Sequence, residues 1–222
     1  MSEPVKRAYH APRREAAAAQ TRATILSAAQ ECFERDGWAA TTVKAVAERA
    51  GVSPKTIEAT FGTKAALLEA TVTFVFRGTD EDVPVMEHAP ARAFAATNTA
   101  ADALDKHAAY ARTVGQRTAN IAAVVENAPP VADLWATMLS NVRFGAHWAA
   151  EHIMGQPGLR ADATIELVET TLRLAMDWAT YRLLTTERGM TPAGFEAWMR
   201  EYYARMLLEP GSRSGASEHL KG

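Results

Sequence analysis

Residues 41–68 read TTVKAVAERAGVSPKTIEATFGTKAALL, and this stretch decides the fold. Apolar residues recur at helical spacing over 43–50, with Thr42 positioned as the N-cap and Gly51 just past the helix end. Ser53 can cap a second helix that begins with a proline, whose missing N–H costs nothing there. Two short helices joined by a glycine-containing turn form the helix-turn-helix layout, whose second helix enters the major groove of DNA.

The side chains of this layout divide into an inner and an outer set. The inner set is apolar and would hold the two helices at an angle; it comprises Val46, Ala47, Val52 and Ile57. The outer set would face the groove and comprises Lys55, Thr56, Glu58 and Ala59. On spacing alone, DNA binding and a small helical corner without DNA are equally open.

Helical signals continue on both sides of this stretch. An amphipathic stripe from Ile25 to Phe33 predicts a preceding helix that ends near Gly37, and a further helix is expected to run to about Arg77. Residues 1–16 combine two prolines with four Lys or Arg side chains and are predicted to form a flexible basic arm.

The composition excludes several other classes of protein. The 222 residues are 48% hydrophobic and 23% charged, and no stretch alternates as a strand does, so we predict an all-α fold. The longest stretches without a formal charge span nine residues, far short of the roughly 20 that a membrane helix needs. No signal peptide is evident, and the single cysteine, Cys32, fits a reducing compartment; we therefore expect a cytoplasmic protein with no membrane partner.

Charge is distributed unevenly along the chain. Residues 1–70 hold 10 Lys or Arg against 8 Asp or Glu, whereas residues 71–222 hold 14 against 18. The N-terminal part is mildly basic and the C-terminal part is acidic, which suggests that only the N-terminal part binds an anionic partner.

Residues 41–68 resemble, in register, the DNA-binding signature of the tetracycline-repressor (TetR) family. That signature joins a Thr-Val or Thr-Ile start, an Ala-Gly-Val-Ser turn, a recognition helix, and then Phe, a small residue, Lys and Ala-Leu-Leu. The resemblance implies an N-terminal three-helix helix-turn-helix DNA-binding domain followed by a larger helical ligand-binding and dimerisation domain. The expected divisions are an arm at 1–16, the DNA-binding domain at 17–66, the effector and dimerisation domain at 67–209, and a disordered tail at 210–222.

The family resemblance also implies partners. Such proteins are homodimers that bind palindromic double-stranded operators, and a small molecule in the C-terminal domain lowers their affinity for DNA; no cofactor is implied. The resemblance implies that four residues contact phosphates or support the recognition helix: Thr42, Lys55, Thr56 and Lys64. Arg13 and Arg14 either follow the DNA or form a solubilising tail. The full predicted DNA-binding set is Arg13, Arg14, Thr42, Ser53, Pro54, Lys55, Thr56, Glu58, Ala59 and Lys64.

One departure from the family pattern falls on the recognition helix. The family usually has an aromatic residue, commonly Tyr, where this chain has Glu58, and the next two positions are Ala59 and Thr60. A carboxylate there cannot pair with phosphate. Two roles are open: it accepts a hydrogen bond from a cytosine amino group, or it pairs with Lys55 and steers that lysine.

The apolar pattern near the C-terminal end of the chain predicts dimerisation. If 162–187 is one helix, its polar residues occupy a single stripe and nearly all the rest of its surface is apolar. A last helix over 192–208 is rich in aromatic residues, and two such helices from each chain would form a four-helix bundle; the alternative is one large core without a partner. The predicted interface residues are Val168, Leu172, Ala175, Ala179, Trp198 and Tyr202.

Large apolar side chains in the middle of the chain could line an effector pocket, although each could equally be core. The predicted pocket residues are Phe94, Tyr110, Trp135, Met138, Phe144, Trp148 and Trp178. His147 and Glu151 are one helical turn apart, which is too weak a signal to predict a metal site.

Three classes of function compete. No nucleophile elbow, P-loop, dinucleotide-binding or zinc-protease motif occurs, so we do not expect an enzyme. A helical protein-interaction scaffold would leave residues 41–68 unexplained. We therefore predict a sequence-specific transcriptional regulator, a dimeric repressor that a small, mostly apolar effector releases from its operator.

Overall fold

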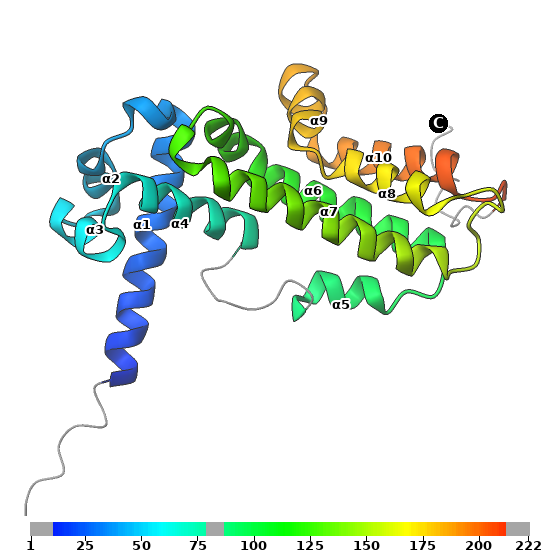
Figure 1. The fold of residues 1–222 in the computed structure, drawn as a ribbon, viewed down its shortest axis with the longest axis horizontal. Coiled ribbons are helices and arrows are strands. Elements are labelled where there is room, and N and C mark those ends of the chain that lie inside the picture. The colour runs from blue at the N-terminus through cyan, green and yellow to red at the C-terminus, as the bar shows by residue number, and fades with distance from the viewer. Residues whose placement is uncertain (1–10, 79–86, 212–222) are drawn as a thin grey trace, which may run out of the picture. The chain divides into compact units, whose positions relative to one another are not determined.

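The computed structural model describes residues 11–78 and 87–211, which are helical without strands in the described parts (Figure 1). An isolated antiparallel bridge joins Leu159 to Leu208. The all-α prediction is confirmed. None of the described helices has the length and apolar character that crossing a membrane requires.

The chain divides into two compact units. The first comprises Met1–Asp80 and Ala123–Ala132, and the second comprises Glu81–Ala122 and Asp133–Gly222. The unit that holds the helix-turn-helix thus runs past the boundary expected after residue 66. Most of the predicted arm and tail, residues 1–10 and 212–222, lies outside the described residues.

The first unit opens with the long helix α1, Ala11–Ala40, which is interrupted at Gly37 by a non-helical φ of 74° and ψ of 175°. Its buried stripe includes Ile25, Leu26 and Phe33, as the sequence predicts. The helix begins earlier than expected, because residues 11–16, predicted as part of a flexible arm, are helical. The alanine run at 16–19 explains the extension, since alanine has the highest helix propensity.

Three shorter helices complete the body of the first unit: α2 (Val43–Ala50), α3 (Pro54–Phe61) and α4 (Lys64–Arg77). Each begins where a hydroxyl side chain accepts a hydrogen bond from a backbone N–H three residues later. The capping residues are Thr42, Ser53 and Thr63. Local sequence therefore sets all three helix starts, since such caps satisfy N–H groups that the helix leaves unpaired.

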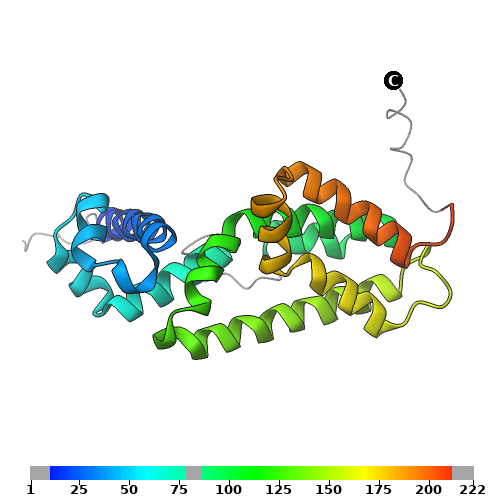
Figure 2. The ribbon, with the colours of Figure 1, turned by 90° about the horizontal axis from the view of Figure 1, so that it is seen from above.

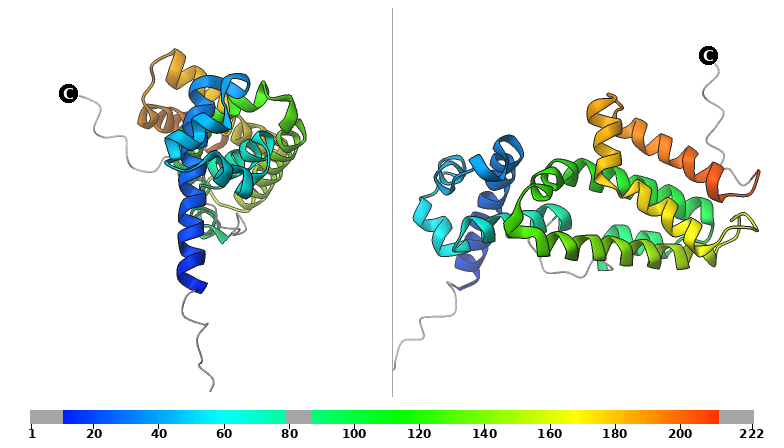
Figure 3. Two further views of the ribbon diagram at one scale, coloured as in Figure 1. Left: turned by 90° about the vertical axis from the view of Figure 1, so that its left-hand side faces the viewer. Right: turned by 45° about the horizontal axis from the view of Figure 1, so that its top comes forward.

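The second unit contains most of α6 (Ala100–Glu126), together with α5 (Ala89–Ala95), α7 (Ala132–Met154) and α10 (Pro192–Leu207). α8 lies beside α7 (Figure 2), where His147 and Glu169 approach to 3.3 Å. α8 and α10 are also neighbours (Figure 3).

The helix expected over 162–187 is not continuous. It is divided into α8 (Ile165–Ala175), α9 (Trp178–Arg182) and a π-helical segment, Leu183–Glu187. Asp177 causes the break, because its carboxylate accepts hydrogen bonds from the backbone N–H and the hydroxyl of Thr180, at 2.9 and 2.6 Å. An aspartate bonded in this way starts a new helix in place of continuing the old one.

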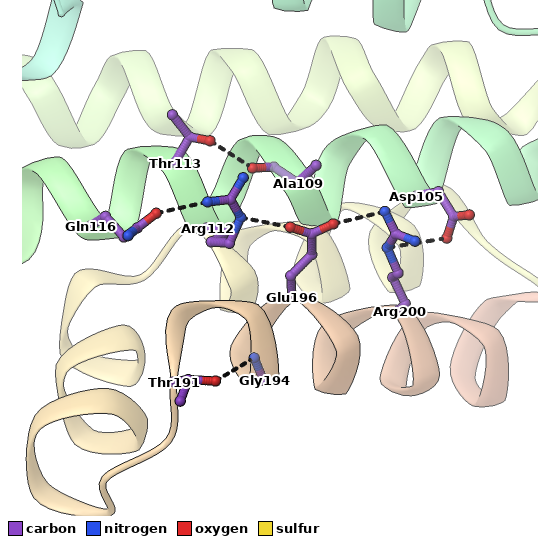
Figure 4. A network of polar contacts seen from close by, with 9 residues as sticks. All are labelled: Asp105, Ala109, Arg112, Thr113, Gln116, Thr191, Gly194, Glu196 and Arg200. Carbon is purple, nitrogen blue, oxygen red and sulfur yellow. Dashed lines mark hydrogen bonds and ion pairs between the residues drawn. The ribbon is translucent and has the colours of Figure 1, made fainter. Parts of the chain in front are cut away.

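A polar network joins α6 to α10 in the second unit (Figure 4). Glu196 accepts from Arg112 at 2.6 Å and from Arg200 at 2.7 Å, and Arg200 also lies 3.8 Å from Asp105. Burial raises the pKa of the Asp105 carboxyl, with the Arg200 charge opposing that rise. The network fixes the register of α6 against α10. Its bond between Arg112 and Glu196 joins residues 84 positions apart in the chain.

Candidate nucleic-acid interface

The turn between α2 and α3 depends on Gly51. Its φ of 68° and ψ of 28° are left-handed, a conformation that favours glycine because a side chain would clash with the backbone. Its N–H points to the carbonyls of Ala47 and Glu48, and the N–H of Val52 donates to the Ala47 carbonyl at 3.0 Å. These bonds close the end of α2 and direct the chain into α3.

Apolar side chains hold the two helices together, as the sequence predicts. Val46 and Ala47 are fully buried, and Ile57 is 1% exposed. Because Ile57 is buried, α3 is fixed in rotation about its axis, and the residues on its opposite face are turned outward. Val52, also predicted for the inner set, is only half-buried.

The outward face of α3 carries most of the predicted DNA-binding residues. Pro54, Lys55, Glu58 and Ala59 are exposed, and Thr56 is half-buried. The hydroxyls of Ser53 and Thr56 bond to each other at 2.8 Å, and Ser53 also accepts from the Thr56 N–H. These two hydroxyls therefore stabilise the helix start, while the neighbouring exposed side chains remain available to a ligand.

The ion pair by which Glu58 was predicted to steer Lys55 is not formed in the described part of the chain. In the described part of the chain, the Glu58 carboxylate and the Lys55 ammonium have neither a hydrogen bond nor an ion pair. An i, i+4 pair does form on α2, between Lys44 and Glu48 at 3.9 Å.

Thr42 and Lys64 both stabilise the domain through hydrogen bonds to its backbone. Thr42 is exposed and accepts from the Ala45 N–H at 3.1 Å, which caps α2. The Lys64 ammonium donates to the carbonyls of Trp38 and Thr41 at 2.8 and 3.0 Å and lies 4.2 Å from the Trp38 ring centroid. The predicted phosphate contact of Lys64 stays a prediction, but the structure adds a role that sequence reasoning missed: its ammonium caps carbonyls at the C-terminal end of α1, those of Trp38 and Thr41.

The N-terminal arginines lie on α1. Arg14 is exposed, and Arg13 belongs to the helix, although its side chain is not among the described ones. Both of their predicted roles remain open. Sequence reasoning also missed Arg22, whose guanidinium lies 4.7 Å from the centroid of the Phe61 ring at the end of α3.

The predicted dimer residues fall into two groups. Val168 and Leu172 are fully buried within the chain and Ala175 is 2% exposed, so their prediction as contacts with a partner is wrong. They pack in the core because the helical period shows which residues share a face, not which neighbour covers it. The remaining three, Ala179, Trp198 and Tyr202, are exposed or half-buried.

The predicted pocket residues do not form one cluster. Phe94 packs on Trp148 with ring centroids 5.3 Å apart, and Trp135 packs on Trp178 at 4.3 Å. Tyr110 is half-buried and Met138 is buried. Phe144 is 68% exposed and so lies outside the packed core, and its role as a lining residue stays a prediction.

Two open surface hollows are bordered by other residues. One, of about 560 Å³, is bordered by α1 and Arg49 of α2, and the other, of about 620 Å³, is bordered by residues 160–162, 205 and 208–210. In the first, Arg49 forms an ion pair with Glu31. Neither hollow includes a predicted pocket residue.

A buried polar pair in the second unit has no counterpart in the sequence analysis. The Nδ1 atom of His107 lies 2.8 Å from the Tyr203 hydroxyl, and both residues are buried. Burial lowers the pKa of His107 to about 4, so the ring is neutral at pH 7. Phe94 lies 6.5 Å from this ring, centroid to centroid, which closes one side of the site.

The chain is similar to a known family in sequence over residues 25–71 and to solved structures in fold over most of its length. Residues 25–71 match the family described as bacterial regulatory proteins, tetR family. No curated protein matches the chain. A transcriptional regulator from Saccharomonospora viridis in complex with choline is 16% identical, with a TM-score of 0.63 over 86% of this chain and 99% of that one.

Two repressor or regulator structures are similar to the same degree. NalD, the secondary repressor of the MexAB-OprM multidrug efflux pump in Pseudomonas aeruginosa, is 16% identical, with a TM-score of 0.60 over 86% of this chain and 97% of its own. The ketosteroid transcriptional regulator KstR2 of Mycobacterium tuberculosis is 14% identical, with a TM-score of 0.58 over 85% and 95%. At these identities the likeness shows a shared fold.

The family match spans the segment that forms the helix-turn-helix, including its turn, its helix caps and the buried apolar residues between α2 and α3. The TetR-family proteins are DNA-binding transcriptional regulators, and the structures of similar fold include a transcriptional regulator and a repressor. Residues 25–71 therefore match the tetR family of bacterial regulatory proteins, and the chain shares its fold with structures of transcriptional regulators.

Proposed function

We propose that this protein binds a palindromic DNA operator as a homodimer and represses transcription until a small, mostly apolar effector releases it. The observation that carries the proposal is the outward face of α3, held by buried Ile57 and presenting Lys55 and its exposed neighbours. A recognition helix of this kind inserts its N-terminal residues into the major groove.

Exposed apolar side chains on α8, α10 and the π-helical segment support dimerisation. Trp198 is 39% exposed and stacks on Tyr202, with ring centroids 5.7 Å apart and planes at 12°. Leu174 and Leu183 are 38% and 44% exposed. A second copy could cover these side chains, and a two-fold interface would place two recognition helices on the two halves of a palindrome.

The aromatic pairs of the second unit support an apolar effector. Trp135 and Trp148 are only half-buried, so part of each indole could contact a ligand. One structure of similar fold is a complex with choline, which supports the use of this fold for binding a small molecule.

Selection of bound sequences from random duplex DNA tests the proposed function. We expect an enriched palindrome, and expect Lys55→Glu to weaken binding to it at least tenfold, because the negatively charged duplex repels the new carboxylate. Lys106→Glu, in the second unit, makes the same charge change on a partly exposed lysine and should leave binding unchanged. Failure to enrich any sequence would support a protein-interaction scaffold instead.

The dimer and the effector need separate measurements. Light scattering should give about twice the 24.0 kDa chain mass at low micromolar concentration, and Trp198→Glu should shift the protein towards monomer. An effector should dissociate the operator complex in a gel-shift assay, and aromatic or aliphatic compounds are expected to do so before highly charged ones. A folded wild-type monomer that still binds the palindrome tightly would contradict the dimer.

A further inference from the structure

The outward face of α3 presents two charges of opposite sign and one methyl group. Lys55, Glu58 and Ala59 are at positions i, i+3 and i+4, which place them on one side of the helix, and all three are exposed. The base that this face selects in DNA can be inferred from these side chains, provided that the proposed function holds.

The neighbouring polar groups are already engaged, whereas Glu58 is not. Ser53 and Thr56 bond to each other, and the Thr60 hydroxyl donates to the Thr56 carbonyl at 2.8 Å. The Glu58 carboxylate has no hydrogen bond or ion pair within the described ranges. Since buried Ile57 fixes the rotation of α3, the adjacent Glu58 cannot turn away without unpacking the helix.

A free carboxylate on a groove-facing surface needs a hydrogen-bond donor, because phosphate repels it. The major groove offers two exocyclic amino donors, N4 of cytosine and N6 of adenine. In adenine the amino group lies beside N7, an acceptor that also repels a carboxylate. We propose that Glu58 accepts a hydrogen bond from N4 of a cytosine in each half of the operator and sets the base preference there.

The positive charge of Lys55 offsets the repulsion between the Glu58 carboxylate and the DNA. Its ammonium is on the same face of α3, one turn before Glu58, and is equally unengaged in the part of the chain that the structure describes. The guanine paired with the cytosine presents O6 and N7, the acceptors that a lysine recognises. A lysine and a glutamate on one helix face therefore complement the two bases of one C·G pair.

Selection from random duplex DNA with full-length variants tests this inference. The variants are Glu58→Gln, Glu58→Ala and, as a control for loss of one negative charge, Glu48→Gln on α2, whose carboxylate is also exposed. The wild type should prefer cytosine at one position in each half-site. Glu58→Gln should move that preference to adenine, since an amide pairs with N6 and N7, by about 5- to 100-fold in relative affinity. Glu58→Ala should lose the preference, and Glu48→Gln should keep it.

The other outcomes separate two kinds of failure. If Glu58→Gln and Glu58→Ala keep the base preferences of the wild type, or tighten binding to all duplexes equally, the cytosine contact is overturned while the operator function stands. If the wild type enriches no sequence, the proposed function itself is overturned, and this inference with it. Melting curves of the variants should match the wild type because these side chains are exposed.

Discussion

The ring of Tyr181 packs directly against the α-carbon of Gly115. A Cβ atom on Gly115 would lie 2.3 Å from Cδ2 of Tyr181 and 2.6 Å from its Cγ, closer than any non-bonded carbon pair can approach. Glycine in the middle of α6 is therefore a packing requirement, since a helix interior otherwise disfavours glycine. The contact joins α6 to α9 inside the second unit.

Replacing Gly115 should destabilise the protein. Gly115→Ala forces the Tyr181 ring to move, and overpacking of this kind costs about 1–3 kcal/mol of unfolding free energy. Gly145→Ala is the matched control: it also lies within a helix, but its added Cβ would meet no atom within 4 Å. That control should stabilise the protein by about 0.5–1 kcal/mol. Thermal or urea unfolding measures both, and equal effects would contradict the contact.

The buried His107 should make stability depend on pH. Its folded pKa of about 4 lies below the ordinary histidine value of 6.5, so the unfolded chain binds its proton first as the pH falls. The contribution of this residue is therefore intact above pH 6.5 and is lost between pH 6.5 and about 4, by up to roughly 3 kcal/mol.

This pH dependence can be tested by a substitution that keeps the hydrogen bond to Tyr203 but replaces the titratable imidazole of His107. His107→Asn places an amide near the position of Nδ1, which bonds Tyr203, and should flatten the stability curve between pH 6.5 and 4. A slope that persists in His107→Asn would assign the titration to another group.

Two lysines of the DNA-binding unit should respond in opposite ways to loss of charge. Lys64→Met removes the donor to the Trp38 and Thr41 carbonyls and should cost roughly 1–3 kcal/mol of unfolding free energy. Lys55→Met should leave stability unchanged, yet reduce the slope of log affinity against log salt by up to about 0.9, because one cation that neutralises phosphate charge is lost. If Lys64→Met lowers the salt slope instead, its ammonium contacts phosphate.

The network around Glu196 should contribute to the stability of the second unit. Glu196→Gln removes the charge that both Arg112 and Arg200 contact, and should lower the unfolding free energy by roughly 1–2 kcal/mol. The loss should shrink in high salt, since part of it is electrostatic. Glu187→Gln, an exposed glutamate in the π-helical segment, is the control and should have little effect. Equal losses in both variants would argue against the network.

Sequence alone determined the helix-turn-helix, because the signals for it are local. Caps at Thr42 and Ser53, the turn at Gly51 and the apolar positions of α2 and α3 all act within about two helical turns. Such signals depend on backbone geometry and on neighbours that are near in sequence, so they could be read before any tertiary contact was known.

Only the tertiary structure decided which segments far apart in the sequence meet. The spacing of Val168 and Leu172 marked an apolar face correctly, but whether another helix of the same chain or a partner covers it depends on long-range packing. The bonds of Lys64 to Trp38 and of His107 to Tyr203 join residues 26 and 96 positions apart. No periodicity encodes such pairings, because they arise only when separate helices meet.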